Sequence, residues 1–260
     1  MTLEASDLSV RFGGVAALDG VGITLEAGTI HGVIGPNGSG KSTMFNCLTG
    51  FVRPDSGKVL LDGHDISDTP IHQRIHRGLA RTFQTPRFDP STSVWQAIAC
   101  GLYPNTGRGL LSSMLWTPGV RRREKDVRDA VDVLLDDFRL QDVRDEPIGG
   151  LSLGRVRLVE VARGVAMSPK YLLLDEPAAG LAKDEQVLLA DELERLAGSG
   201  IGVLIVEHNF DLVIRICHQV LVLNRGRVLV QGDGPTIADH EGVRRIYLGL
   251  DDAEAGGIAS

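Results

Sequence analysis

The segment Gly35-Pro36-Asn37-Gly38-Ser39-Gly40-Lys41-Ser42 decides how this chain folds. A glycine, four residues and then Gly-Lys-Ser form the pattern of a phosphate-binding loop, here called the phosphate loop. The context agrees, because an apolar run at residues 29–34 comes before it and a helical pattern at about residues 41–48 follows. A glycine-rich turn without a ligand would have no use for the Lys-Ser pair. The sequence therefore predicts a strand, an anion-binding loop and a helix.

The chemistry of the phosphate loop points to a nucleotide. Its glycines let backbone N–H groups turn toward an anion, and the following helix adds the positive end of its dipole. Lys41 can reach the β- and γ-phosphates as a point charge, and the Ser42 hydroxyl can bind Mg²⁺. We expect ATP to contact Gly35, Pro36, Asn37, Gly38, Ser39, Gly40, Lys41, Ser42 and Thr43.

A second group of polar residues follows another apolar run, in Leu172-Leu173-Leu174-Asp175-Glu176-Pro177. Parallel sheets bind ligands beyond the carboxyl ends of their strands, so both carboxylates are expected in a site. Asp175 would hold Mg²⁺, and Glu176 would orient the attacking water or act as general base. An acidic helix N-terminus is the alternative for this pair taken alone.

The order of apolar runs indicates an α/β fold. Short alternating stretches at residues 8–12 and 22–25, and a stretch at 58–62, favour antiparallel strands. Unbroken apolar runs at residues 171–174 and 201–206 alternate with helical patterns, which is typical of a parallel sheet covered on both faces. Residues 94–144 have mostly helical patterning, and residues 220–230 contain a hairpin signal.

Composition narrows the classes of partner. The chain has 260 residues, is 43% hydrophobic and carries a net charge of −7, which does not favour nucleic acid as a partner. No apolar run is long enough to cross a bilayer, and the N-terminus lacks the features of a signal peptide. Cys47, Cys100 and Cys217 have no metal-like spacing and are expected to be small buried side chains. We therefore expect a cytoplasmic protein whose membrane role comes through partner subunits.

Taken together, the motifs resemble those of ABC transporter ATPases. The phosphate loop, Gln84, the segment Leu151-Ser152-Leu153-Gly154-Arg155, the Asp175-Glu176 pair and His208 occur in the order of that family. The resemblance implies that this segment, here called the signature segment, binds the γ-phosphate held by a second subunit. Two ATP molecules would then lie within a head-to-tail dimer. An ordinary N-capped helix is the alternative for the signature segment alone.

Further roles are implied by position in the family. Gln84 resembles the glutamine that contacts Mg²⁺ and links the catalytic core to a helical subdomain, and His208 resembles the histidine that contacts the γ-phosphate. Phe12 resembles the aromatic residue that stacks on adenine. A strand-end histidine and a core phenylalanine are the alternatives for His208 and Phe12.

The chain also departs from the family pattern. The consensus signature is Leu-Ser-Gly-Gly-Gln, whereas Leu153 and Arg155 stand here in place of its first glycine and its glutamine. Ser152 and Gly154, which have the clearest contact roles, remain. The dimer-facing loop of the family usually carries Ser and Asp, whereas residues 178–182 here are Ala-Ala-Gly-Leu-Ala. These departures bear on hydrolysis and interface coupling more than on ATP binding.

The resemblance implies a P-loop ATPase core with a mostly parallel sheet, an antiparallel β subdomain and an inserted helical subdomain. The expected division is residues 1–83 for the antiparallel and phosphate-loop part, 84–165 for the helical subdomain, 166–250 for the second part of the core and 251–260 for a tail. The surface facing the membrane subunits is expected from Gln84 to about Leu115. The apolar residues 110, 111 and 114–116 either belong to that surface or pack inside the helical subdomain.

A finer likeness is to ATPases of branched-chain amino-acid uptake. It rests on Arg-Thr-Phe-Gln-Thr-Pro at residues 81–86, Glu-Pro-Ala-Ala-Gly-Leu at 176–181, Val-Glu-His-Asn at 206–209 and Ile-Tyr-Leu-Gly at 246–249. The implied partners are membrane-spanning transporter subunits, a second ATPase subunit and, indirectly, a solute-binding protein, with the chain at the cytoplasmic face of the membrane. Urea or amide uptake, lipopolysaccharide export, an ABC ATPase without a transporter and a nucleotide-binding regulator that does not hydrolyse remain alternatives.

Overall fold

An antiparallel sheet forms one end of the molecule. The computed structural model describes residues 1–82, 88–102 and 118–248. Four strands pair in the order β2-β1-β4-β5, and they are β1 (Thr2–Phe12), β2 (Val15–Glu26), β4 (Ser56–Leu61) and β5 (His64–Asp65). Side chains on β1 alternate between buried and more exposed positions, with Leu3 and Ala5 in the core. The predicted antiparallel strands are therefore confirmed.

A second, six-stranded sheet lies at the centre of the molecule. Its order is β10-β9-β3-β8-β7-β6, from β3 (Ile30–Ile34), β6 (Leu79–Arg81), β7 (Tyr171–Asp175), β8 (Gly202–Val206), β9 (Gln219–Asn224) and β10 (Arg227–Gly232). Every pairing is parallel except that of the edge strand β10 with β9. This confirms a mostly parallel sheet. The strand β6 had no clear pattern in the sequence.

Two hydrophobic cores lie on opposite faces of the six-stranded sheet. On β7, Leu172 and Leu174 belong to one core, whereas Tyr171 and Leu173 belong to the other. The second core also holds the apolar residues of β1 and of helix α1 (Lys41–Thr49), and the first holds those of α5 (Leu153–Ala166). Because both faces are covered, residues 171–174 of β7 and 203–206 of β8 form apolar runs, as the sequence indicated.

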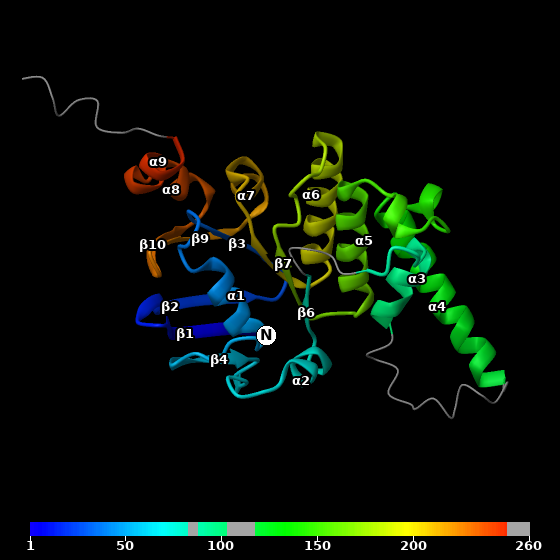
Figure 1. Ribbon diagram of the computed structural model, residues 1–260, viewed down its shortest axis with the longest axis horizontal. Coiled ribbons are helices and arrows are strands. Elements are labelled where there is room, and N and C mark those ends of the chain that lie inside the picture. The colour runs from blue at the N-terminus through cyan, green and yellow to red at the C-terminus, as the bar shows by residue number, and fades with distance from the viewer. Residues whose placement is uncertain (83–87, 103–117, 249–260) are drawn as a thin grey trace, which may run out of the picture.

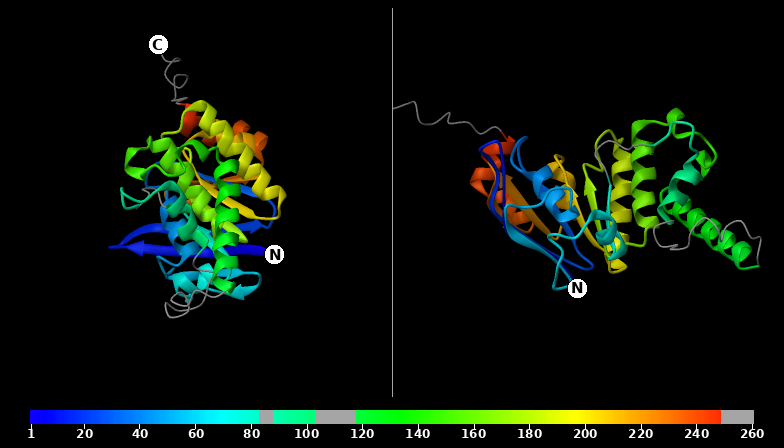
Figure 2. Two further views of the ribbon diagram at one scale, coloured as in Figure 1. Left: turned by 90° about the vertical axis from the view of Figure 1, so that its right-hand side faces the viewer. Right: turned by 60° about the horizontal axis from the view of Figure 1, so that its bottom comes forward.

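Helices surround the central sheet and extend to the other end of the molecule. Figure 1 shows α3 and α4 at the end opposite the antiparallel strands, and the right-hand view of Figure 2 shows the same separation. The remaining helices are α2 (Ile71–His76), α3 (Val94–Ala99), α4 (Pro118–Asp137), α6 (Lys183–Gly198), α7 (Phe210–Ile216), α8 (Gly234–Asp239) and α9 (Glu241–Leu248). The helical character of the middle of the chain is thus confirmed, while the exact division into subdomains stays a prediction. Gln84, the apolar residues 110, 111 and 114–116 and the tail 251–260 lie outside the described residues.

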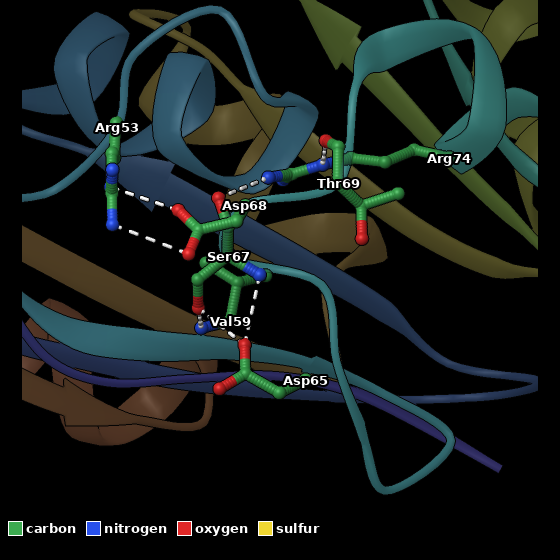
Figure 3. A network of polar contacts seen from close by, with 7 residues as sticks. All are labelled: Arg53, Val59, Asp65, Ser67, Asp68, Thr69 and Arg74. Carbon is green, nitrogen blue, oxygen red and sulfur yellow. Dashed lines mark hydrogen bonds and ion pairs between the residues drawn. The ribbon is translucent and has the colours of Figure 1, made fainter.

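A buried arginine fixes the far end of the helix that follows the phosphate loop. Arg74 is 1% exposed, and its Nη1 donates to the carbonyls of Cys47 at 2.9 Å and Leu48 at 2.7 Å, in the last turn of α1. The same guanidinium donates to the carbonyls of Thr69 and Ser67, in the turn before α2 (Figure 3). A cation is favourable at the negative end of a helix dipole. Arg74 therefore joins α1 to the segment that leads into β6.

Candidate functional site

The phosphate loop connects β3 to α1, as the sequence predicted. Lys41 is nearly buried, and its Nζ donates to the carbonyls of Gly35 at 2.7 Å and Pro36 at 3.1 Å. Burial lowers the pKa of Lys41, and the nearby carboxylates of Glu176 and Asp175 oppose that shift. The ammonium group is thus held against the loop, where an incoming phosphate would replace the carbonyl oxygens as its partner.

The glycines of the phosphate loop are required by close approach of neighbouring backbone. Gly40 has φ 107°, and a Cβ there would lie 2.6 Å from the Ala17 carbonyl oxygen on β2. A Cβ at Gly35 would lie 2.2 Å from the Leu223 carbonyl oxygen on β9. Only glycine fits both positions, so the loop is fixed between two strands.

One buried hydroxyl in the loop lacks a protein partner. The Ser39 side chain is 1% exposed, and its Oγ has no hydrogen-bond partner among the described residues. Asn37 and Gly38 lie exposed at the crown of the loop, while Ser42 and Thr43 lie in the first turn of α1. A buried hydroxyl without a partner is costly. A phosphate oxygen would satisfy it.

Asp175 ends β7 and meets the cation of Arg81. Its backbone N–H donates to Thr82 Oγ1 at 3.3 Å, and its Oδ2 lies 3.8 Å from Arg81 Nη2. Burial raises the pKa of the Asp175 carboxyl, and Arg81 is the main group that opposes this rise. A divalent cation would stabilise the ionised carboxylate in the same way.

The donor set fits Mg²⁺ better than a metal held by protein side chains alone. No group of three or more His, Cys, Asp or Glu side chains in the described ranges could hold a metal ion. Mg²⁺ usually binds one or two protein oxygens together with water and substrate phosphates. The Asp175 carboxylate and the Ser42 hydroxyl are the described groups that could supply such oxygens, and Gln84 lies outside the described residues.

Glu176 and His208 meet at the carboxyl ends of two neighbouring strands. His208 Nε2 lies 3.0 Å from Glu176 Oε1, and the Glu176 N–H donates to the Val206 carbonyl at 2.8 Å. Glu176 has φ 50°, which is uncommon for a residue other than glycine. Residues in such backbone conformations occur at functional sites more often than elsewhere. This conformation lets consecutive carboxylates take different surroundings, with Asp175 beside Arg81 and Glu176 beside His208.

The signature segment starts α5 and is capped in the ordinary way. Ser152 Oγ accepts the Arg155 N–H at 3.3 Å, while the Arg155 guanidinium pairs with Asp142 at 2.7 Å. A Cβ at Gly154 would lie 2.3 Å from Glu185 Oε2, so a larger residue there would force the Glu185 carboxylate to shift. Helix α5 packs on the face of the sheet opposite to α1. Within one chain, Ser152 and Gly154 therefore do not lie on the face of the sheet that α1 covers, next to the phosphate loop.

Phe12 lies at the end of β1. The alternative prediction, that it is a core residue, is wrong. Its side chain is 54% exposed, opposite the exposed Val15 in the β1–β2 hairpin. Strand β2 continues from Val15 to Ala17, whose carbonyl abuts Gly40 of the phosphate loop. An exposed ring on this hairpin is available for stacking on a base.

Comparison with known proteins agrees with this geometry. Residues 18–179 match the family model described as ABC transporter. The chain belongs to the ABC transporter family. It is 35% identical over 248 residues to the high-affinity branched-chain amino acid transport ATP-binding protein BraF of Pseudomonas aeruginosa, which covers 95% of this chain and 97% of that protein. It is an ATPase subunit of this family.

Two further relatives extend the comparison. The lipopolysaccharide export system ATP-binding protein LptB of Escherichia coli is 32% identical over 250 residues, with 96% of this chain and 98% of that protein covered. A crystal structure of the ADP conformation of an ATP-binding cassette of an ABC transporter is 31% identical, with a TM-score of 0.82. The match extends over 96% of this chain and 99% of the chain in that structure. ABC cassettes thus bind nucleotide with this fold.

A groove separates the nucleotide site of this ABC ATPase from its helical end. Its volume is about 260 Å³, and the residues that line it are Thr49, Phe51, Ile71, Arg74, Ile75, Leu79, Arg81, Cys100, Gly101, Arg163, Gly164 and Met167. Cys100 is exposed, so the prediction that all three cysteines are buried is wrong for this residue. Cys47 and Cys217 are buried, as predicted. Cys100 lies at the C-terminal end of the short helix α3, beside this groove rather than in a core.

Two residues of the site were not singled out from the sequence. Arg81 contacts both Asp175 and the groove, and Glu207 is a buried carboxylate next to His208. For Glu207 the signal was a charged residue directly after an apolar run, where charge is seldom buried without a partner. Arg81 had no comparable signal, because the strand that it ends has only three residues. No helix of the described ranges is long and apolar enough to cross a membrane.

Proposed function

We propose that the chain hydrolyses ATP at a site formed by Lys41, Asp175, Glu176 and His208. The observation that carries this proposal is the 3.0 Å contact between Glu176 and His208, beside the lysine and the metal-binding carboxylate. Lys41 would exchange the loop carbonyls for the β- and γ-phosphates. Mg²⁺, held by Asp175 and Ser42 and by Gln84 as the family resemblance implies, would neutralise phosphate charge when bound.

Glu176 and His208 have complementary tasks in this proposal. Glu176 would accept a hydrogen bond from the attacking water and orient it toward the γ-phosphate. His208 would turn from Glu176 to donate to a γ-phosphate oxygen. A pure nucleotide-binding regulator would need neither side chain, which favours hydrolysis over the regulator that does not hydrolyse.

The test replaces the carboxylate of Glu176 by an amide. Glu176→Gln should keep ATP binding but lose most steady-state phosphate release, because an amide cannot act as base. Glu194→Gln, at an exposed position of α6, is the matched control and should release phosphate at the wild-type rate. Near wild-type release by Glu176→Gln would rule out this role.

We further propose that two ATPase subunits enclose the nucleotide head to tail. Ser152 is exposed and Leu153 is 57% exposed at the start of α5, so the signature segment is open to a second subunit. The backbone N–H groups and the dipole at the N-terminal end of α5 suit an anion. A phosphate bound at Lys41 would lie across the sheet from the signature segment of the same chain. The signature segment would therefore bind the phosphate of a second subunit.

The partner in the membrane is proposed to be a membrane-spanning subunit that places a short segment in the groove. An ABC transporter needs spanning subunits, and the groove offers apolar side chains such as Phe51, Ile75 and Met167. It also lies where the core meets the helical end, and Arg81 reaches from it to Asp175. The proposed contact is near the predicted surface, whereas the apolar residues 110, 111 and 114–116 lie outside the described residues. The chain would thus sit at the cytoplasmic face of the membrane.

Cross-linking from the native thiol tests the docking position. Cys100 is the exposed cysteine of the three, so a thiol-reactive cross-linker on the assembled complex should join it to the membrane subunits. The control is Cys100→Ser combined with Val228→Cys, at an exposed position on the β10 hairpin. Cross-links from position 228 and none from Cys100 would overturn the proposed orientation.

The transported solute is proposed to be a branched-chain amino acid or a similar small polar solute. The relative BraF is named for that transport, and its likeness extends over nearly the whole chain. LptB, named for lipopolysaccharide export, is a relative at 32% identity, so export remains the second candidate. In vesicles holding the complete transporter, a leucine-loaded binding protein should stimulate phosphate release. Stimulation by lipopolysaccharide alone would favour export.

A further inference from the structure

The loop of residues 178–182 has no polar side chain with which to hold itself in place. It is separated from Glu176 by Pro177 alone and leads into α6, so it lies between the catalytic carboxylate and a long helix. The Ala178 and Leu181 side chains pack in the hydrophobic core, and the hydrogen bonds of the loop come from its backbone groups. The partners of those backbone groups therefore help to decide where the loop lies.

Side chains outside the loop supply these partners. Glu207 Oε1 accepts the Ala178 N–H at 2.7 Å, at the start of the loop. Glu185 Oε2 accepts the Ala182 N–H at 2.8 Å, at its end. Both acceptors are carboxylates, which make stronger hydrogen bonds than neutral groups do. The loop is thus held at its start by the residue that follows β8 and at its end by a residue of α6.

Glu207 also holds the segment that carries His208. It is 3% exposed, directly after β8, and its Oε2 accepts the His208 N–H at 3.1 Å. Burial raises the pKa of Glu207, while the N–H groups of Ala178, His208 and Asn209 oppose that rise. Each of its two oxygens has a different backbone donor. One buried carboxylate therefore joins the loop to the histidine.

A second connection runs parallel to the first. Asn209 Nδ2 donates to Gln186 Oε1 at 3.2 Å, and Gln186 Nε2 donates to the Leu181 carbonyl at 3.1 Å. This connection joins the residue after His208 to the far half of the loop. The start of the loop is therefore connected to His208 through Glu207, and Leu181 is connected to Asn209 through Gln186.

We propose that Glu207 is a positioning residue that makes His208 and the loop of residues 178–182 one mechanical unit. Burying the Glu207 carboxylate without partners would be unfavourable. The hydrogen bonds from the N–H groups of Ala178 and His208 offset that cost. A shift of His208 toward the γ-phosphate would move the loop with it, toward the second subunit. The inference rests on the proposed role of His208, and it explains how a loop without Ser and Asp is kept in position.

Glu207→Gln is the informative change because it keeps size and removes one acceptor. One of its terminal groups becomes NH₂, which would face the N–H of Ala178 or His208 and repel it. We expect kcat to fall by about tenfold or more, since displacement of a catalytic group by even 1 Å can cost that much. The KM for ATP and the affinity for a fluorescent ATP analogue should stay within about twofold, because the phosphate loop is untouched.

The matched control is Asp233→Asn. Asp233 Oδ1 accepts the Thr236 N–H at 3.0 Å at the start of α8, and asparagine caps a helix equally well. This exchange of carboxylate for amide should leave both kcat and KM at wild-type values. A second comparison uses His208→Ala alone and combined with Glu207→Gln. The double variant should be no slower than His208→Ala, because the effect of Glu207 on hydrolysis passes through His208.

Each outcome bears on the proposal. A fall in kcat with unchanged ATP affinity supports it. A folded Glu207→Gln variant with kcat within about threefold of wild type, or with an equal loss of ATP affinity, overturns it. If that variant does not fold, Gln186→Leu breaks the parallel connection without touching the buried charge, and wild-type kcat there would equally overturn the proposal. Absence of phosphate release in the wild-type chain would instead contradict the proposed function.

Discussion

The contacts of Arg81 allow one prediction to be worked through in energy. The guanidinium lies 4.7 Å from the centre of the Phe45 ring and 4.5 Å from that of Phe51. We consider Arg81→Met, which keeps a stem of similar shape and removes the charge. The two cation–π contacts contribute about 1 kcal/mol each. Their loss is only partly offset by the apolar contacts that methionine retains.

Polar contacts add to that loss. Arg81 Nη1 donates to Asn46 Oδ1 at 2.7 Å and to Thr49 Oγ1 at 2.9 Å, and charged hydrogen bonds of this kind are worth about 1.5 kcal/mol each. The Asp175 carboxylate would remain buried without its cation. Against these losses stands the relief from burying the guanidinium, so we expect a net loss of about 3 kcal/mol. For a domain of this size that lowers Tm by roughly 6–12 °C.

The same change should alter the pH dependence of hydrolysis. Arg81 opposes the rise in the pKa of Asp175 that burial causes. Without Arg81 the pKa of Asp175 is higher still, so the carboxyl takes up a proton at a higher pH. Mg²⁺-dependent phosphate release should then be lost at a higher pH as the solution is acidified.

Thermal melts and pH profiles of phosphate release measure both effects. Arg81→Lys keeps the charge but cannot form the planar set of contacts, so it should lose stability and keep the acid side of the profile close to that of wild type. A methionine variant that melts within about 2 °C of wild type, with an unchanged acid side, would refute the reasoning about this residue.

Three further predictions concern the phosphate loop, the signature segment and the exposed ring of Phe12. Because burial lowers the pKa of Lys41, ATP affinity measured by fluorescence should start to fall at a lower alkaline pH than an exposed lysine would allow, whereas AMP affinity should not. Gly154→Ala places a Cβ 2.3 Å from Glu185 Oε2 and should cost about 1 kcal/mol in thermal unfolding, whereas Gly150→Ala, with nothing within 4 Å, should cost little. Phe12→Ala should raise the KM for ATP and GTP alike by about tenfold with kcat unchanged, because stacking has no base-specific hydrogen bond; equal KM values for variant and wild type would exclude the stacking role.

Motifs with local geometry could be predicted from the sequence. Residues 171–174 of β7 and 203–206 of β8 are unbroken apolar runs because both faces of these strands are buried, and that pattern is visible without any tertiary knowledge. The phosphate loop is equally local, since its glycines, lysine and helix start are consecutive. Glu176 and His208 were recognised as functional residues separately, and the structure adds that they meet.

Residues whose role comes from distant neighbours could not be predicted. Strand β6 has only three residues, too few for a periodic pattern. Arg81 gains its role from Phe45 and Asp175, which are far away in the sequence. Glu207 looks like a polar strand end until its oxygens are seen to accept the N–H groups of Ala178 and His208. The exposure of Cys100 likewise depends on the groove beside α3.

Light scattering of the Glu176→Gln variant, with and without ATP and Mg²⁺, tests the central claim most directly. The claim is that this ABC ATPase binds ATP between two subunits, with the phosphate loop of one facing the signature segment of the other. The variant should be monomeric without nucleotide and have twice that mass at saturating ATP, and adding Ser152→Arg should keep it monomeric because the larger side chain fills the anion site. A Glu176→Gln chain that binds ATP fully and stays monomeric, or a Ser152→Arg variant that still dimerises, would contradict the account.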